Sequence, residues 1–102
     1  MTAEQGEQQA LQARLGQRLQ VRLVARPGAG ESWRIATPLG HIVRQYKEPN
    51  FVRLDSGLGG RSWISFYLEA VTIGEIEIEF YRVGPGRGAP TVGKFLLKVN
   101  VL

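Results

Sequence analysis

The sequence contains no cysteine and only one histidine, His41, among its 102 residues. Disulfides, thiolate nucleophiles and cysteine-ligated metals are therefore excluded. A zinc site needs several ligands and a serine nucleophile needs a base beside it, whereas His41 follows Pro38-Leu39-Gly40 in an expected turn. We interpret His41 as a surface residue, and we expect no metal site and no cofactor.

Long apolar runs are also missing. No stretch approaches the roughly 20 apolar residues that span a membrane, so we expect no membrane span. Residues 1–20 are polar and rich in Gln and Glu, without the apolar region of a signal peptide. Two locations stay open: the protein is cytoplasmic, or it is periplasmic or secreted with a leader that this sequence does not include.

Acidic residues are in the minority, with nine Asp and Glu against 13 Lys and Arg and a formal net charge of +4. A basic balance favours nucleic acid or an acidic partner. The arginines, however, are scattered along the chain at Arg14, Arg18, Arg22, Arg26, Arg34, Arg44 and Arg53. Scattered charge is typical of a solvated surface, so we expect no nucleic-acid partner.

Glycine and alternating apolar residues are abundant instead. Leu19, Val21 and Leu23 alternate with polar neighbours, which is the period of a half-buried strand. The same alternation predicts strands over residues 33–35, 42–46, 51–54, 63–70, 76–80 and 95–101. About seven short strands separated by glycine and proline turns predict an all-β fold, either a sandwich or a barrel.

The first fifteen residues do not follow this pattern. Residues 4–14 are good helix formers, but only Ala10, Leu11 and Leu15 would give such a helix an apolar face. We therefore expect residues 1–15 to form a polar tail or a short helix, and residues 16–102 to form the β domain.

Neither of the two remaining patterns predicts catalysis. Glu75, Glu77 and Glu79 alternate with apolar residues, so they share one solvent-facing side where cross-strand cations can pair with them. The glycine runs 57–60 and 84–88 each precede a strand, whereas a phosphate-binding loop precedes a helix. We expect no nucleotide site, and we expect that the protein is not an enzyme.

Several short motifs follow one another in a recognisable order. They are Leu15-Gly16-Gln17-Arg18-Leu19, Ser32-Trp33, Gly57-Leu58-Gly59-Gly60, Phe66-Tyr67-Leu68-Glu69-Ala70, Gly74 and Tyr81-Arg82. This order resembles the chagasin family, proteinaceous inhibitors of papain-like cysteine proteases. The resemblance spans residues 15–102 and implies an antiparallel, immunoglobulin-like β-sandwich.

The resemblance also implies a binding site made of three loops at one end of the sandwich. The middle loop is Gly57, Leu58, Gly59 and Gly60, which matches the family's Gly-x-Gly-Gly completely and would enter the protease cleft with Leu58 nearest the catalytic centre. The first loop would contribute Pro27, Gly28, Ala29, Gly30 and Glu31, and the third Arg82, Val83 and Gly84. The family's outer loops read Asn-Pro-Thr-Thr-Gly-aromatic and Arg-Pro-aromatic, so only Pro27, Gly30 and Arg82 correspond there.

Three functions are compatible with these patterns. The resemblance implies reversible inhibition of a papain-like cysteine protease by occlusion of its cleft. The alternative is a non-catalytic binding module on the same scaffold with a different partner, because a fold does not determine a function. The third is single-stranded nucleic-acid binding, for which Trp63, Tyr67 and Tyr81 would supply stacking rings, although the sequence shows no ordered basic patch.

Overall fold

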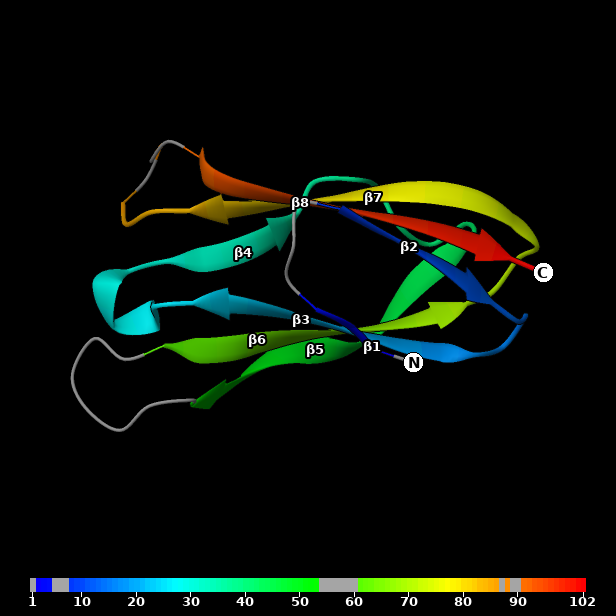
Figure 1. The fold of residues 1–102 in the computed structure, drawn as a ribbon, viewed down its shortest axis with the longest axis horizontal. Coiled ribbons are helices and arrows are strands. Elements are labelled where there is room, and N and C mark those ends of the chain that lie inside the picture. The colour runs from blue at the N-terminus through cyan, green and yellow to red at the C-terminus, as the bar shows by residue number, and fades with distance from the viewer. Residues whose placement is uncertain (1, 5–7, 54–60, 87, 89–90) are drawn as a thin grey trace.

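The computed structural model describes residues 2–4, 8–53, 61–86, 88 and 91–102. These residues form two four-stranded sheets, which lie one against the other (Figure 1). Sheet A has the strand order β1-β3-β6-β5, and sheet B has the order β2-β8-β7-β4. The predicted all-β, immunoglobulin-like sandwich is confirmed, and the barrel is not formed.

The strands alternate with short connections along the described chain. They are β1 Thr2–Glu4, β2 Gln8–Ala13, β3 Arg18–Ala25, β4 Ser32–Ile35, β5 Val43–Arg53, β6 Ser62–Ala70, β7 Gly74–Val83 and β8 Thr91–Val101, and a 3-10 turn, η1, covers Pro27–Ala29. No helix in these residues is long and apolar enough to cross a membrane.

The core lies between the two sheets and follows the predicted alternation. Every second residue of β3 and β6, and of β8 from Phe95 onward, is buried, as predicted from the period of two. Phe66 of sheet A meets Phe80 of sheet B edge to face, with ring centroids 5.3 Å apart, and Phe95 adjoins Phe80 at 5.8 Å. The Phe66–Phe80 pair joins the inner faces of the two sheets into one core.

Strand β5 replaces two of the predicted strands. The sequence predicted a break at Pro49, but pairing with β6 continues from Val43 to Arg53, with irregular register between Gln45 and Asn50. Because β5 is the edge strand of sheet A, a residue without an N–H can be accommodated there. The bulges and the proline also make this edge a poor template for pairing with another chain.

The N-terminal segment contains two strands, so the expected tail or short helix is wrong for residues 2–4 and 8–13. Strand β1 pairs with β3 in parallel, and β2 pairs with β8 in parallel. Ala13 is buried in the core, and Leu11 packs against it. A short isolated helix is marginal in water, whereas the edges of both sheets offer unpaired backbone groups to an extended chain.

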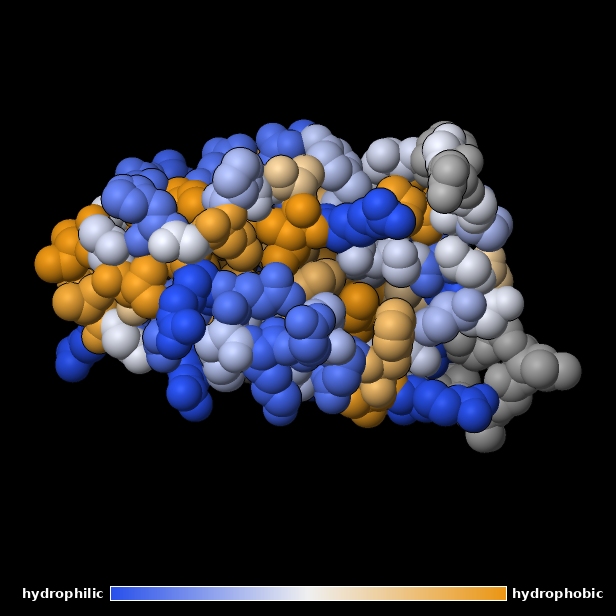
Figure 2. Space-filling view, turned by 180° about the vertical axis from the view of Figure 1, so that it is seen from behind, coloured by the Kyte–Doolittle hydropathy of each residue, from blue (hydrophilic) through white to orange (hydrophobic). Residues whose placement is uncertain are grey.

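The two ends of the sandwich differ in character. Leu15, Ile73 and Leu102 are exposed at the end that holds the C-terminus, and the Leu15 N–H donates to the Leu102 carbonyl at 3.1 Å. Figure 2 shows hydrophobic side chains gathered at its left, which is the C-terminal end on the right of Figure 1. The opposite end carries polar and glycine-rich connections.

Candidate functional site

Strand pairing brings three connections to one end of the sandwich. In sheet A, Ala25 lies opposite Ser62, which in turn lies opposite Arg53. In sheet B, Val83 lies opposite both Ser32 and Thr91. The connections 26–31, 54–61 and 84–90 therefore leave from strand ends at the same end of the molecule, on the left of Figure 1. We call this the loop end.

The middle connection has only its stems in the described structure. Gly57, Leu58, Gly59 and Gly60 lie outside the described residues, so their predicted role stays a prediction. On either side of this connection, Arg53 and Ser62 are paired across β5 and β6.

The first connection is a compact turn that presents its backbone to solvent. In η1 the Ala29 N–H donates to the Arg26 carbonyl at 3.0 Å, and the Gly30 N–H donates to the Pro27 carbonyl at 2.9 Å. Pro27, Gly28, Ala29 and Gly30 are exposed, as a binding loop requires. Glu31 is half-buried and closes the turn, since its carboxylate accepts from the Arg26 N–H at 3.3 Å. Of the five predicted residues, four are accessible and Glu31 is engaged within the loop.

Trp33 anchors this first connection to the core. Its side chain is 5% exposed, and its Nε1–H donates to the Val24 carbonyl at 2.9 Å. Because Val24 is in sheet A and Trp33 is in sheet B, this bond ties together the two stems of the loop across the sandwich. The position of η1 is therefore determined by packing beneath it.

The third connection begins with residues that are less accessible. Arg82, Val83 and Gly84 are all half-buried. The Arg82 guanidinium donates to the Val92 carbonyl at 3.2 Å, and the Cβ, Nε and Cζ atoms of this arginine lie close to Gly93. This placement holds Arg82 along β8 and stabilises the stem of the loop.

The first and third connections touch one another. Gly30 has φ +81°, and a Cβ atom added to it would lie 2.6 Å from Cβ of Pro85. Real carbon atoms do not approach so closely, so only glycine allows this contact. Gly30 of the first connection and Pro85 of the third are therefore in close contact.

A groove of about 580 Å³ lies beside this contact. Its walls belong to β4, β7 and the connections that adjoin them. The lining residues are Gly30, Ser32, Arg34, Val83, Gly84, Gly86 and Gly88. Because four of these residues are glycines, much of the wall is bare backbone. Sequence reasoning assigned Arg34 to scattered surface charge and did not place it at the loop end.

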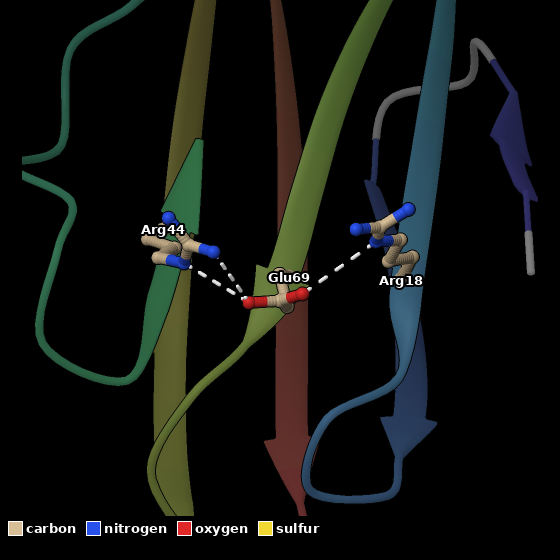
Figure 3. A network of polar contacts seen from close by, with 3 residues as sticks. All are labelled: Arg18, Arg44 and Glu69. Atoms are coloured by element: carbon tan, nitrogen blue, oxygen red, sulfur yellow. Dashed lines mark hydrogen bonds and ion pairs between the residues drawn. The ribbon is translucent and has the colours of Figure 1, made fainter. Parts of the chain in front are cut away.

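The outer face of sheet A holds a second group of polar residues, which sequence reasoning also missed. Glu69 accepts from Arg44 Nε at 3.0 Å and Nη2 at 2.8 Å, and it forms an ion pair with Arg18 Nε at 3.5 Å (Figure 3). The hydrogen bond from Arg44, followed by the effects of Arg18, holds the pKa of Glu69 below its ordinary value. Alternation predicts the face of each residue, but only the strand order brings these three together.

Two glutamates of the acidic row on β7 have partners, and for Glu75 this partner is the predicted cross-strand cation. Lys98 Nζ lies 2.9 Å from Glu75, and this contact raises the pKa of Lys98. The Tyr81 hydroxyl donates to Glu79 at 2.6 Å, which raises the pKa of Tyr81. Within the described residues, no group of three or more His, Cys, Asp or Glu side chains could hold a metal ion.

Three solved structures share this fold. The cysteine protease inhibitor EhICP2 from Entamoeba histolytica superimposes with a TM-score of 0.81 at 16% identity, over 99% of this chain and 94% of its own. PbICP-C, solved in complex with falcipain-2, gives a TM-score of 0.68 at 17% identity, over 99% and 98% of the two chains. Amebosin gives a TM-score of 0.67 at 19% identity, over 99% and 96%. No protein-family model matches the sequence, and no curated protein does.

Proposed function

We propose that this chain is a reversible, non-covalent inhibitor of papain-like cysteine proteases and is not an enzyme. The observation that carries the proposal is the convergence of three connections at one end of a sandwich whose fold is shared with EhICP2 and PbICP-C. EhICP2 is a cysteine protease inhibitor, and PbICP-C was solved bound to falcipain-2. The chagasin-like motifs of the sequence support the same function.

In this proposal the middle connection enters the active-site cleft. A Gly-x-Gly-Gly backbone is narrow enough for such a groove, and Leu58 offers a single apolar anchor. Pro27, Gly28, Ala29 and Gly30 contact one wall of the cleft, and the third connection with Gly84 contacts the other. An interface of this kind buries about 1,600 Å² in total, which three loops together can supply.

Preorganisation of the outer loops supports the proposal. Trp33 ties the stems of the first loop, and Gly30 packs against Pro85 of the third. A loop that already has its bound conformation loses less conformational entropy when it docks. Less of the free energy of the contacts with the protease is therefore offset by the cost of ordering the inhibitor.

Charge at the loop end favours a protease with an acidic rim. Arg26 and Arg61 are exposed beside the first and middle connections. Cations at the edge of an interface accelerate association more than they strengthen the complex, and salt screens the effect. We expect inhibition to become slower in onset as ionic strength rises.

A second candidate is a binding module with a different partner. It is favoured by the outer loops, since Gly28 and Ala29 replace the family's threonines and Arg82 is engaged by Val92. Affinity capture from a lysate discriminates the two functions. Enrichment of partners that are not proteases, without inhibition of any papain-like enzyme, would favour the module.

The experiment that tests the proposal titrates papain and a cathepsin L-type protease with the protein and with a Gly59→Glu variant. We expect the parent to inhibit and the variant to lose at least tenfold in affinity, because a charged side chain would enter an apolar cleft. Thr72→Glu adds the same charge in the exposed turn at the opposite end and is the matched control. Full protease activity at micromolar parent protein would refute the proposal.

A further inference from the structure

Arg34 points away from the core, on the opposite face of its strand from Trp33 and Ile35. Strand β4 is the edge of sheet B, and its neighbours Trp33 and Ile35 pack towards the core. Alternation therefore directs Arg34 outwards, where it is exposed and lines the groove of about 580 Å³. Arg34 lies opposite Tyr81 in the sheet, two residues from the paired Ser32 and Val83 at the loop end.

Among the described residues, Arg34 has no hydrogen bond or ion pair through its guanidinium group. Glu79 of the neighbouring strand β7 and Glu31, which precedes β4, have other partners. Glu79 accepts the Tyr81 hydroxyl at 2.6 Å, and Glu31 accepts the Arg26 N–H at 3.3 Å. The groove therefore contains an arginine whose five donors are available to an incoming acceptor.

The walls of the groove suit a carboxylate that arrives from outside. Gly30, Gly84, Gly86 and Gly88 contribute backbone and no side chain to the groove wall. The Ser32 side chain adds a hydroxyl donor on the same wall. A volume of this order accommodates one side chain or a short segment of a partner. A planar guanidinium binds a carboxylate with two parallel hydrogen bonds, which gives direction as well as affinity.

We infer that this groove binds an Asp or Glu side chain on the rim of the inhibited protease, with Arg34 as its direct partner. The inference rests on the proposed function and deepens it. The groove adjoins both outer connections, so a protease seated on the loop end has its rim against β4. Arg34 then selects among papain-like proteases according to whether they carry a carboxylate at that position.

The test compares Arg34→Gln and Arg34→Lys with the parent against papain and the cathepsin L-type enzyme. Inhibition is measured from the residual protease activity, and the association and dissociation rates are measured by surface plasmon resonance. In this inference the carboxylate is enclosed in the groove and hydrogen-bonded, unlike a cation at the solvated edge of the interface. For a protease that carries the carboxylate, we therefore expect Arg34→Gln to raise the dissociation rate roughly 10- to 100-fold with little change in the association rate. Arg34→Lys keeps the charge without the two-pronged geometry and should recover only part of the loss. Arg14→Gln removes an exposed arginine at the opposite end and is the matched control.

The outcomes distinguish a failure of the inference from a failure of the proposed function. A dissociation rate within twofold of the parent for Arg34→Gln, against every protease that the parent inhibits, overturns the inference and leaves the proposed function intact. A change confined to the association rate and abolished by salt also overturns it, because Arg34 would then act only by long-range attraction. A parent that inhibits neither protease refutes the function and the inference together. Thermal unfolding of each variant confirms that the fold is retained.

Discussion

The outer face of sheet A and the groove beside the loop end use the same residue type in opposite ways. On sheet A, Arg18 lies over the Tyr46 ring at 4.5 Å and pairs with Glu69, which also binds Arg44. In the groove, the Arg34 guanidinium has no such partner among the described residues. A cation that is held by neighbours stabilises the sheet, whereas an unengaged cation in a concave site is available to a partner.

The same comparison bears on nucleic-acid binding. Arg22 lies 5.0 Å from the centre of the Trp63 ring, and Lys47 lies 4.7 Å from that of Tyr67. A base could stack on these rings only after displacing the cations that cover them. The ordered group of cations and rings on sheet A is therefore better explained by contacts within the sheet than by an unoccupied stacking platform.

Removing the anchor of the loop end should have the largest effect on stability. Trp33→Ala deletes a buried ring and its bond to Val24, so we expect a loss of about 3–5 kcal/mol in the free energy of unfolding. Urea denaturation followed by circular dichroism measures this loss. Trp33→Phe keeps most of the volume but loses the hydrogen bond to Val24, so it should cost only about 1–2 kcal/mol. A loss below 1 kcal/mol for the alanine variant would show that Trp33 does not anchor the loop.

Separating the two outer loops should have the next largest effect. Gly30→Ala meets both an unfavourable φ of +81° and Pro85, whereas Gly16→Ala at φ +87° has nothing within 4 Å of the new Cβ. The positive φ costs both variants about 1–2 kcal/mol, and only Gly30→Ala should lose more. Thermal unfolding of the pair isolates the contact with Pro85. If the loop contact matters for binding, Gly30→Ala alone should also weaken inhibition; equal losses from both variants would contradict the packing of the two loops.

The smallest effect should come from the engaged cations of sheet A. The pKa of Glu69 is lowered from its ordinary value of 4.5, so its ion pairs stabilise the fold above that pH and are lost as the pH falls below it. Glu69→Gln has no such group to titrate. As the pH is lowered from 5, the free energy of unfolding of the parent should therefore fall slightly more than that of the variant. Urea denaturation at low salt measures both. Parallel curves for the two proteins would show that the pairs of Figure 3 do not contribute.

Local patterns were sufficient to predict most of the fold. The period of two predicted the buried faces of β3, β6, β7 and β8, because a half-buried strand can be recognised from its own residues. The glycine and proline clusters predicted the turns, including those that meet at the loop end. The acidic row of β7 was also placed correctly on the solvent side, where Glu75 meets Lys98.

Features that depend on partners distant in the chain could not be predicted in this way. The N-terminal residues have little strand propensity, and they become strands because β3 and β8 offer them an edge. Pro49 was expected to end a strand, yet it is tolerated because β5 lies at the edge of its sheet.

Partners that are distant in the chain also determine which arginines of this protein are engaged. In the sequence, Arg18, Arg34 and Arg44 are equivalent exposed cations at alternating positions. The order of strands in sheet A places Arg18 and Arg44 on either side of Glu69, and the pairing of β4 with β7 places Arg34 in a groove of glycine backbone. Alternation is a property of one strand and can be read from it, whereas a partner or a groove is made by residues far apart in the chain and exists only once the sheets have assembled.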